Sequence, residues 1–213
     1  MIHKINNFLP SNEAEILYEK IMKTPQHWWK KARIGNDFTN PKMSGDTLED
    51  RVEKERLRRA NEKSVQAHKF TYQFTRSTAH VSNCVCYECT FKKEMLKSER
   101  FKQLLQKCTN LKNPTLGESF TSVYEAGDFL GVHTDEKRGL AFIYNLSKNW
   151  APEYGGMLHI RNEDGSWAAY TPGFNEMVIM QLGETGIPHF VSEVTSFAPT
   201  PRLAISGWFN ESS

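Results

Sequence analysis

The sequence predicts a mainly β protein in which a barrel or sandwich is flanked on one side by helices. Apolar residues recur at helical spacing only before residue 110. Beyond residue 115, short apolar segments follow one another and are separated by glycine and proline. The length of 213 residues is enough for one domain with a substantial core. We therefore expect a single domain over residues 1–213, with helical support and substrate loops in residues 1–115 and the barrel in residues 116–210.

The first helix is predicted between a short extended segment at residues 2–9 and Pro25. Asn12 is a suitable N-cap with Glu15 at the third helical position, as in a capping box. The apolar residues fall at positions i, i+3, i+4 and i+7 and form one stripe. They are Ala14, Leu17, Tyr18 and Ile21. We expect this helix to support the barrel from outside.

The next segments are predicted from their residue types. Residues 28–48 mix tryptophan with Gly, Asn, Pro and Asp, which indicates irregular structure. Residues 49–69 carry interleaved charges of both signs, which is typical of a solvated face. Alternating aromatic and polar residues predict a strand at 70–75, and residues 98–108 predict a second amphipathic helix. The barrel strands are predicted at residues 119–125, 129–135, 140–146, 157–160, 176–182, 189–196 and 202–209.

The four cysteines allow two interpretations. Cys84, Cys86, Cys89 and Cys108 are enough for a four-thiolate zinc site, but a second CxxC pair, the usual signature of such a site, is missing. The sequence therefore favours small apolar residues that pack under a loop. Without a secretory signal, the cysteines are expected to be reduced thiols.

Charge and hydropathy exclude several partners. The formal net charge is +2, from 27 basic and 25 acidic residues, which is too weak a field to indicate a nucleic-acid or membrane partner. No apolar run approaches the roughly 20 residues that span a bilayer, and the N-terminus lacks a signal pattern. We expect a cytoplasmic protein.

A candidate metal site lies within the predicted barrel. His133 and Asp135 are two positions apart in a predicted strand, so their side chains point to one face. Two histidines and a carboxylate on one face of an octahedral ion form the facial triad that suits non-haem Fe(II). His189 is the best candidate for the third ligand. Arg202 opens the last apolar segment, and its cation suits the far carboxylate of a dicarboxylic co-substrate.

The order of the HxD pair, the distant His189 and Arg202 resembles the Fe(II)/2-oxoglutarate-dependent oxygenase superfamily, in its prolyl 4-hydroxylase-like branch. Residues 124–130 resemble the YxxG lead-in of prolyl hydroxylases. Residues 143–150, followed by Gly155-Gly156, resemble the YxLNxxW…GG segment of that branch. The resemblance implies a double-stranded β-helix core of the jelly-roll or cupin-like kind.

The resemblance also implies a set of ligands. His133, Asp135 and His189 are expected to bind Fe(II), which leaves positions for 2-oxoglutarate and O2. Arg202 is expected to bind the distal carboxylate of 2-oxoglutarate, and ascorbate is expected to stimulate turnover. Three further residues are expected in the co-substrate pocket by family position or by sharing the face of Arg202. They are Tyr124, Asn145 and Ser206.

The activity implied is hydroxylation of an unactivated C–H bond, first of all in a prolyl residue of a protein or peptide. Hydroxylation of a free amino acid or small metabolite is the alternative, and a non-catalytic binding module on the same barrel is a second one. Position 208 is Trp, where nucleic-acid demethylases of the superfamily carry a second Arg, so that class is disfavoured. We expect residues 77–83 to cover the mouth of the site, with Arg76 contacting the substrate.

Overall fold

The computed structural model describes residues 1–25, 28–33, 59, 62–63, 70–77, 84–109, 114–135 and 138–211. Its strands are β1 (Ile2–Asn6), β2 (Trp29–Arg33), β3 (Tyr72–Ser77), β4 (Pro114–Tyr124), β5 (Phe129–His133), β6 (Leu140–Leu146), β7 (Leu158–Arg161), β8 (Trp167–Tyr170), β9 (Phe174–Gln181), β10 (His189–Val191) and β11 (Arg202–Glu211). Its helices are α1 (Ser11–Met22), α3 (Tyr87–Phe91), the π-helix η2 (Lys92–Leu96), α4 (Glu99–Cys108) and the 3-10 helix η3 (Pro152–Tyr154).

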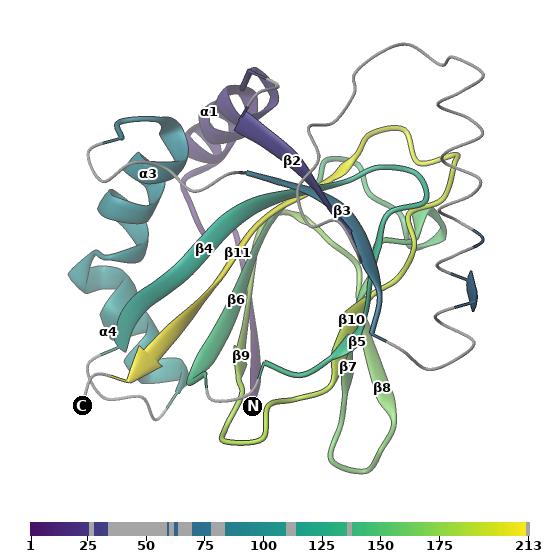
Figure 1. Ribbon diagram of the computed structural model, residues 1–213. Coiled ribbons are helices and arrows are strands. Elements are labelled where there is room, and N and C mark those ends of the chain that lie inside the picture. The colour runs from purple at the N-terminus through teal and green to yellow at the C-terminus, as the bar shows by residue number, and fades with distance from the viewer. Residues whose placement is uncertain are drawn as a thin grey trace.

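The strands form one 11-stranded sheet in the order β1-β9-β6-β11-β4-β3-β5-β10-β7-β8, with β2 paired to β3. Every pairing is antiparallel. The sheet curls until its two halves face each other, while the helices lie outside it (Figure 1). The fold is therefore mainly β with flanking helices, and it matches the expected double-stranded β-helix core.

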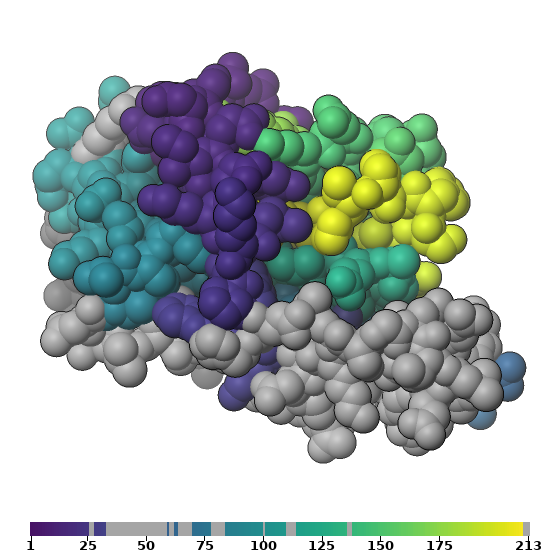
Figure 2. All heavy atoms as spheres, turned by 90° about the horizontal axis from the view of Figure 1, so that it is seen from above, coloured from purple at the N-terminus to yellow at the C-terminus, as the bar shows by residue number. Residues whose placement is uncertain are grey.

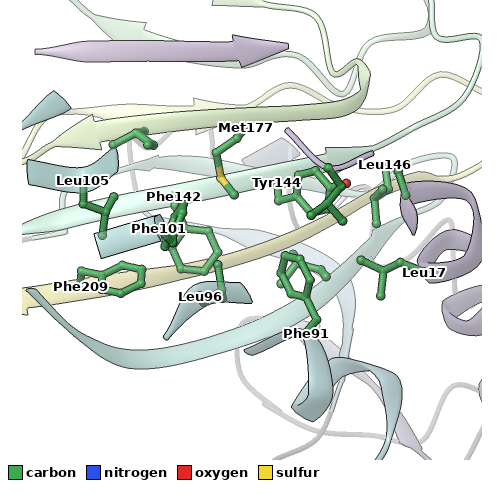
Figure 3. Packing of buried hydrophobic residues seen from close by; sticks show 14 of the residues in the cluster. Leu17, Phe91, Leu96, Phe101, Leu105, Phe142, Tyr144, Leu146, Met177 and Phe209 are labelled. Atoms are coloured by element: carbon green, nitrogen blue, oxygen red, sulfur yellow. The ribbon is translucent and has the colours of Figure 1, made fainter. Parts of the chain in front are cut away.

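Strand β6 is buried along its whole length because both faces of the sheet are covered. Phe142 and Tyr144 belong to the core between the sheet and the helices. Ala141 and Ile143 belong to a second core inside the curl. Figure 3 shows the first core, where the ring of Tyr144 stacks on Phe91 with centroids 5.4 Å apart. Successive residues of β6 therefore pack alternately into the outer core and the core inside the curl.

The helices cover the outer face of this half of the sheet. Helix α1 buries Ala14, Leu17 and Ile21, as its apolar stripe predicted. The Ser98 side chain caps α4 by accepting a 3.2 Å hydrogen bond from the backbone N–H of Phe101. Seen from above, the purple N-terminal residues lie between the teal helical residues and the green and yellow residues of the later chain (Figure 2). Among the described residues, no helix is long and apolar enough to cross a membrane.

The capping box predicted for the first helix is wrong. Helix α1 begins at Ser11, so Asn12 already lies inside it, and no side chain caps it. The carbonyl of Pro10 accepts the backbone N–H groups of Glu13 and Ala14 instead, at 2.9 and 3.1 Å. The fixed backbone of proline starts this helix two residues earlier than the side-chain pattern indicates.

Several elements differ from the predicted ones, among them β10, which ends at Val191 rather than at residue 196. Residues 29–33 form strand β2, where irregular structure was predicted, and β8 was not predicted at all. Both lie against another strand, β2 against β3 and β8 against β7. Residues 87–91, expected under a loop, form helix α3. The predicted charged segment at 49–69 lies almost entirely outside the described residues.

Two isoleucines of α1 test the outer core. Ile21 is 1% exposed and Ile16 is 52% exposed, so the same substitution samples a buried and a solvated site on one helix. We expect Ile21→Ala to lower the free energy of unfolding by about 2–5 kcal/mol, because it removes buried methyl groups and leaves a cavity. Ile16→Ala is expected to change it by about 0.5 kcal/mol or less. Urea denaturation of both variants measures this, and equal losses would contradict the assignment of the buried face.

Candidate metal centre and co-substrate pocket

The side chains of His133, Asp135 and His189 converge at one point. The antiparallel pairing of β10 with β5 places His189 opposite His133, with ring centroids 4.2 Å apart. Nε2 of His133 lies 3.9 Å from Oδ1 of Asp135, and Nε2 of His189 lies 3.6 Å from Oδ2 of Asp135. One ligand atom from each residue lies within 4.8 Å of the other two. The structure thus brings together the three residues selected from the sequence, at a spacing suited to one metal ion.

Both imidazole rings are oriented by a backbone carbonyl two residues earlier. Nδ1 of His133 lies 2.9 Å from the oxygen of Gly131, and Nδ1 of His189 lies 2.7 Å from the oxygen of Ile187. A ring nitrogen that faces a carbonyl oxygen carries the proton, so Nε2 keeps its lone pair for a metal. Burial, reinforced by the neighbouring His133, lowers the pKa of His189, which favours the neutral, metal-binding form.

Asp135 lies beyond the end of β5, which corrects the strand predicted at 129–135. Because β5 ends at His133, strand alternation does not aim the Asp135 carboxylate. Instead, Nε1 of Trp208 donates a 2.7 Å hydrogen bond to Oδ2 of Asp135. The guanidinium of Arg138 lies 4.1 Å from the centroid of the Trp208 ring. Sequence reasoning missed this role of Trp208, although the inward face that Trp208 shares with Arg202 was a usable signal.

Gly186 allows the loop before β10 to approach Asp135. It has a φ of +70°, and an added Cβ would lie 3.0 Å from Cβ of Thr134 and 3.1 Å from the backbone nitrogen of Asp135. Glycine meets both conditions, because it tolerates positive φ and has no side chain. The two segments that carry the candidate ligands can therefore pack directly against each other.

Arg202 is a buried cation without a charged partner in the part of the chain that the structure describes. Its side chain is 2% exposed, and its Nε has no hydrogen-bond partner. Its Nη2 donates a 3.4 Å hydrogen bond to Oδ1 of Asn145, and its guanidinium lies 4.9 Å from the ring centroid of Tyr124. Burial lowers the pKa of Arg202, yet guanidinium groups stay charged in proteins. A buried guanidinium needs an anionic partner, because an unpaired buried charge is costly.

The structure places the other predicted pocket residues along the same inner face. Tyr124 is buried and lies opposite Arg202 in the pairing of β4 with β11. Asn145 lies opposite Ala204 in the pairing of β6 with β11. Ser206 is partly buried and lies along β11 between Arg202 and Trp208. Tyr124 and Asn145 therefore contact Arg202, whereas Ser206 lies two positions from Trp208 on the same strand.

The glycine pair at 155–156 makes room for Arg202. A Cβ on Gly156 would lie 3.0 Å from Cδ of Arg202, and Gly156 also has a positive φ. A Cβ on Gly155 would lie 2.0 Å from the carbonyl oxygen of Glu193. Any side chain at these positions would displace Arg202 or the backbone beside it.

The donor set fits Fe(II) at one end of this face and a dicarboxylate at the other. Two neutral imidazoles and one carboxylate leave a divalent ion with positive charge and open positions. At the other end, the buried guanidinium needs a negative partner, because an uncompensated buried charge is costly. A dicarboxylate with a metal-binding group at one end and a free carboxylate at the other would satisfy both needs.

The proposed substrate loop is only partly described. Arg76 forms a 2.8 Å ion pair with Glu118, and its guanidinium lies 4.1 Å from the centroid of Phe120. Phe120 in turn packs against Trp208, with ring centroids 5.9 Å apart. Arg76 is thus linked through aromatic rings to the residue that holds Asp135. Residues 78–83 of the loop lie outside the described residues.

Trp208→Phe tests the positioning of Asp135. The substitution keeps an aromatic ring but removes the N–H that bonds Oδ2, so we expect Fe(II) affinity to fall by about 10–100-fold. Affinity for 2-oxoglutarate at saturating Fe(II) should change much less, since Arg202 is untouched. Trp167→Phe is the control, because Trp167 is 41% exposed on β8. Anaerobic Fe(II) titration measures the effect, and an unchanged affinity in Trp208→Phe would remove this role.

Solved structures with a similar fold include several oxygenases. A Pseudomonas putida prolyl-4-hydroxylase is 17% identical with a TM-score of 0.56, over 99% of this chain and 92% of its own. A Trichoplax adhaerens prolyl hydroxylase, in complex with a hypoxia inducible factor oxygen degradation domain peptide fragment, is 15% identical with a TM-score of 0.65, over 99% and 83%. A Burkholderia pseudomallei oxidoreductase of the 2OG-Fe(II) oxygenase family is 10% identical with a TM-score of 0.65, over 98% and 84%. At these identities the likeness establishes the fold.

The sequence itself also matches a family. No curated protein matches the chain, but residues 119–210 match the model of the 2OG-Fe(II) oxygenase superfamily. That span contains the three candidate metal ligands and Arg202, and the family implies Fe(II), 2-oxoglutarate and O2. Residues 119–210 are therefore similar to the 2OG-Fe(II) oxygenase superfamily, and together with the fold this match supports a 2-oxoglutarate-dependent dioxygenase.

Proposed function

We propose that this protein hydroxylates a prolyl residue in a protein or peptide, with Fe(II) on His133, Asp135 and His189 and with 2-oxoglutarate held by Arg202. The observation that carries the proposal is the inner face of β11. Trp208, at one end of that face, bonds the candidate ligand Asp135, while Arg202, towards the other end, is a buried cation that lacks an anionic partner. One strand thus carries both Trp208, which positions the candidate ligand Asp135, and Arg202, which would bind the co-substrate carboxylate.

The metal supplies the oxidising power when Fe(II), 2-oxoglutarate and O2 are bound, and the residues of the chain supply its position. His133 and His189 present Nε2 atoms whose rings are fixed by carbonyl groups at Nδ1. Asp135 contributes the negative charge that partly balances a divalent ion. Trp208 restrains Oδ2 of that carboxylate and leaves Oδ1 to face the metal. Fixing these groups in advance lowers the cost of organising the site during turnover.

Arg202 fixes the other end of the co-substrate. Its Nε lacks a hydrogen-bond partner, and its Nη2 makes only a long bond to a neutral amide. A carboxylate that bridges Nε and Nη2 would satisfy both N–H groups in a bidentate arrangement. In this proposal Tyr124 and Asn145 border the bound carboxylate, while Ser206 offers a hydroxyl beside the body of 2-oxoglutarate.

Aromatic rings beside the metal centre favour a prolyl substrate. The ring of Phe70 lies 5.4 Å from that of His133, and Tyr72 follows at 5.3 Å from Phe70. Phe70 is 48% exposed, so its ring is available for contact. The apolar, puckered ring of proline can pack its C–H groups on aromatic faces. The similar structures from Pseudomonas putida and Trichoplax adhaerens are prolyl hydroxylases, and the latter holds a peptide.

Product analysis with Asp135→Ala as the inactive control tests the function. The wild-type protein, given Fe(II), ascorbate and 2-oxoglutarate, should form succinate and add one oxygen atom to proline in a peptide library. Asp135→Ala removes a charged ligand and should abolish both products while the fold is retained by circular dichroism. An added oxygen found only on free amino acids or small metabolites would replace the prolyl assignment. Absence of succinate under all conditions would favour a binding module.

Arg202→Ala separates co-substrate binding from metal binding. Truncating one side of a buried charge pair costs about 2–5 kcal/mol, which corresponds to a rise of at least about 30-fold in the 2-oxoglutarate concentration for half-maximal rate. Fe(II) affinity should stay within about threefold of the wild type, because Arg202 does not contact the three ligands. Succinate release as a function of 2-oxoglutarate concentration gives the first value, and anaerobic Fe(II) titration gives the second. A comparable loss of both affinities would contradict the assigned role.

A further inference from the structure

A second group of potential ligands lies outside the barrel. Cys84, Cys86 and Cys89 each offer a sulfur, and the three atoms lie within 4.8 Å of one another. All three residues are partly buried, and the structure shows thiols rather than disulfides. Cys108, at the end of α4, is not part of the group. The CxCxxC spacing lacks the second pair that the sequence reading required of a zinc site, yet the fold gathers three sulfurs in one place.

Two backbone N–H groups point at sulfur atoms of this group. Cys86 is the N-cap of α3. The backbone N–H of Cys86 donates to Sγ of Cys84, and the backbone N–H of Cys89 donates to Sγ of Cys86, each at 3.5 Å. These contacts hold the sulfurs of Cys84 and Cys86 in place beside Cys89.

Two of the three thiols have a pKa above the ordinary value of cysteine. Burial, together with the thiols of Cys86 and Cys84, raises the pKa of Cys89 to about 12. Burial also raises the pKa of Cys86. A bound metal removes the protons from coordinating thiols outright, so metal binding here must release protons.

We propose that Cys84, Cys86 and Cys89 bind a single thiophilic cation, with Zn²⁺ as the expected ion, at a structural site separate from the iron centre. Zinc binds thiolates at about 2.3 Å in tetrahedral geometry, which places sulfurs roughly 4 Å apart. The observed group is close to that size. Partial exposure leaves a fourth position for water. Soft sulfur ligands select zinc, whereas the imidazole and carboxylate set selects Fe(II), so the two sites are chemically distinct.

The proposed ion would fix α3 against the outer face of the barrel. Glu88, between two of the cysteines, is buried and accepts a 2.8 Å hydrogen bond from Oγ1 of Thr121 on β4. Lys92 pairs with Glu88 at 2.7 Å and donates a 2.6 Å bond to the oxygen of Ser119. Thr121 and Tyr124 are three positions apart on one strand, so they face opposite sides of the sheet. The site would thus support β4 from the side opposite the co-substrate pocket (Figure 1).

Cobalt substitution tests this proposal without relying on turnover. The probe is Co²⁺ added to reduced, metal-free His133→Ala, in which the competing iron centre is disabled. We expect one equivalent of Co²⁺ to produce the intense near-ultraviolet charge-transfer band of a cobalt–thiolate bond, and Zn²⁺ to displace it. Proton release during Zn²⁺ binding should accompany the change.

Cysteine variants in the same background locate the ligands. Cys86→Ser/Cys89→Ser should lose the band, whereas Cys108→Ser, the matched control, should keep it. His133→Ala keeps all four cysteines, so its spectrum does not depend on whether a cysteine variant folds. Absence of a cobalt–thiolate band in His133→Ala therefore overturns the proposal. A band that persists in Cys86→Ser/Cys89→Ser also overturns it, because the cobalt would then be bound by other groups. Neither result affects succinate formation by the wild-type protein, so failure here is distinguishable from failure of the proposed function.

Discussion

The register of β11 between β4 and β6 is the constraint on which both the core and the candidate site depend. Leu203, Ile205 and Phe209 face the helices and belong to the outer core. Arg202 and Trp208 face inward, toward the pocket and the metal ligands. Because side chains alternate along a strand, a slip of one residue would send the arginine into the apolar core and remove the Asp135 hydrogen bond. Stability and chemistry therefore select the same register.

The buried charges inside the curled sheet are ones that a metal ion and a carboxylate would balance. A buried guanidinium and a buried orphan N–H both cost free energy in the protein alone. A carboxylate bound at Arg202 would offset that cost, and it would be held in water-poor surroundings where charge-assisted hydrogen bonds are strong. At the other end, the Asp135 carboxylate lies 3.9 Å from Nε2 of His133 and 3.6 Å from Nε2 of His189. The fold thus carries unbalanced charges of opposite sign, as binding of a metal ion and a dianion requires.

The two candidate metal sites use opposite faces of one sheet and different ligand chemistry. The His and Asp ligands come from β5, β10 and the segment after β5, which only the curled sheet brings together. The three cysteines are close in sequence and are gathered by a single turn into α3. An ion at the first site is positioned for reaction, whereas an ion at the second would secure a helix. Glu88 connects the second site to β4, the strand that carries Tyr124.

The sequence by itself determined the elements whose signal is local. The apolar stripe of α1 and the mostly apolar β6 follow from residue type and spacing. The HxD spacing together with the family resemblance selected His133, Asp135, His189 and Arg202 as candidates. Only the tertiary structure decided β2 and β8, because each strand is completed by hydrogen bonds to a distant or weakly patterned partner. It also decided how Asp135 is aimed, since the bond from Trp208 joins residues 73 positions apart. The proximity of the three cysteine sulfurs likewise depends on where α3 begins, which backbone hydrogen bonding sets and side-chain periodicity over so few residues does not reveal.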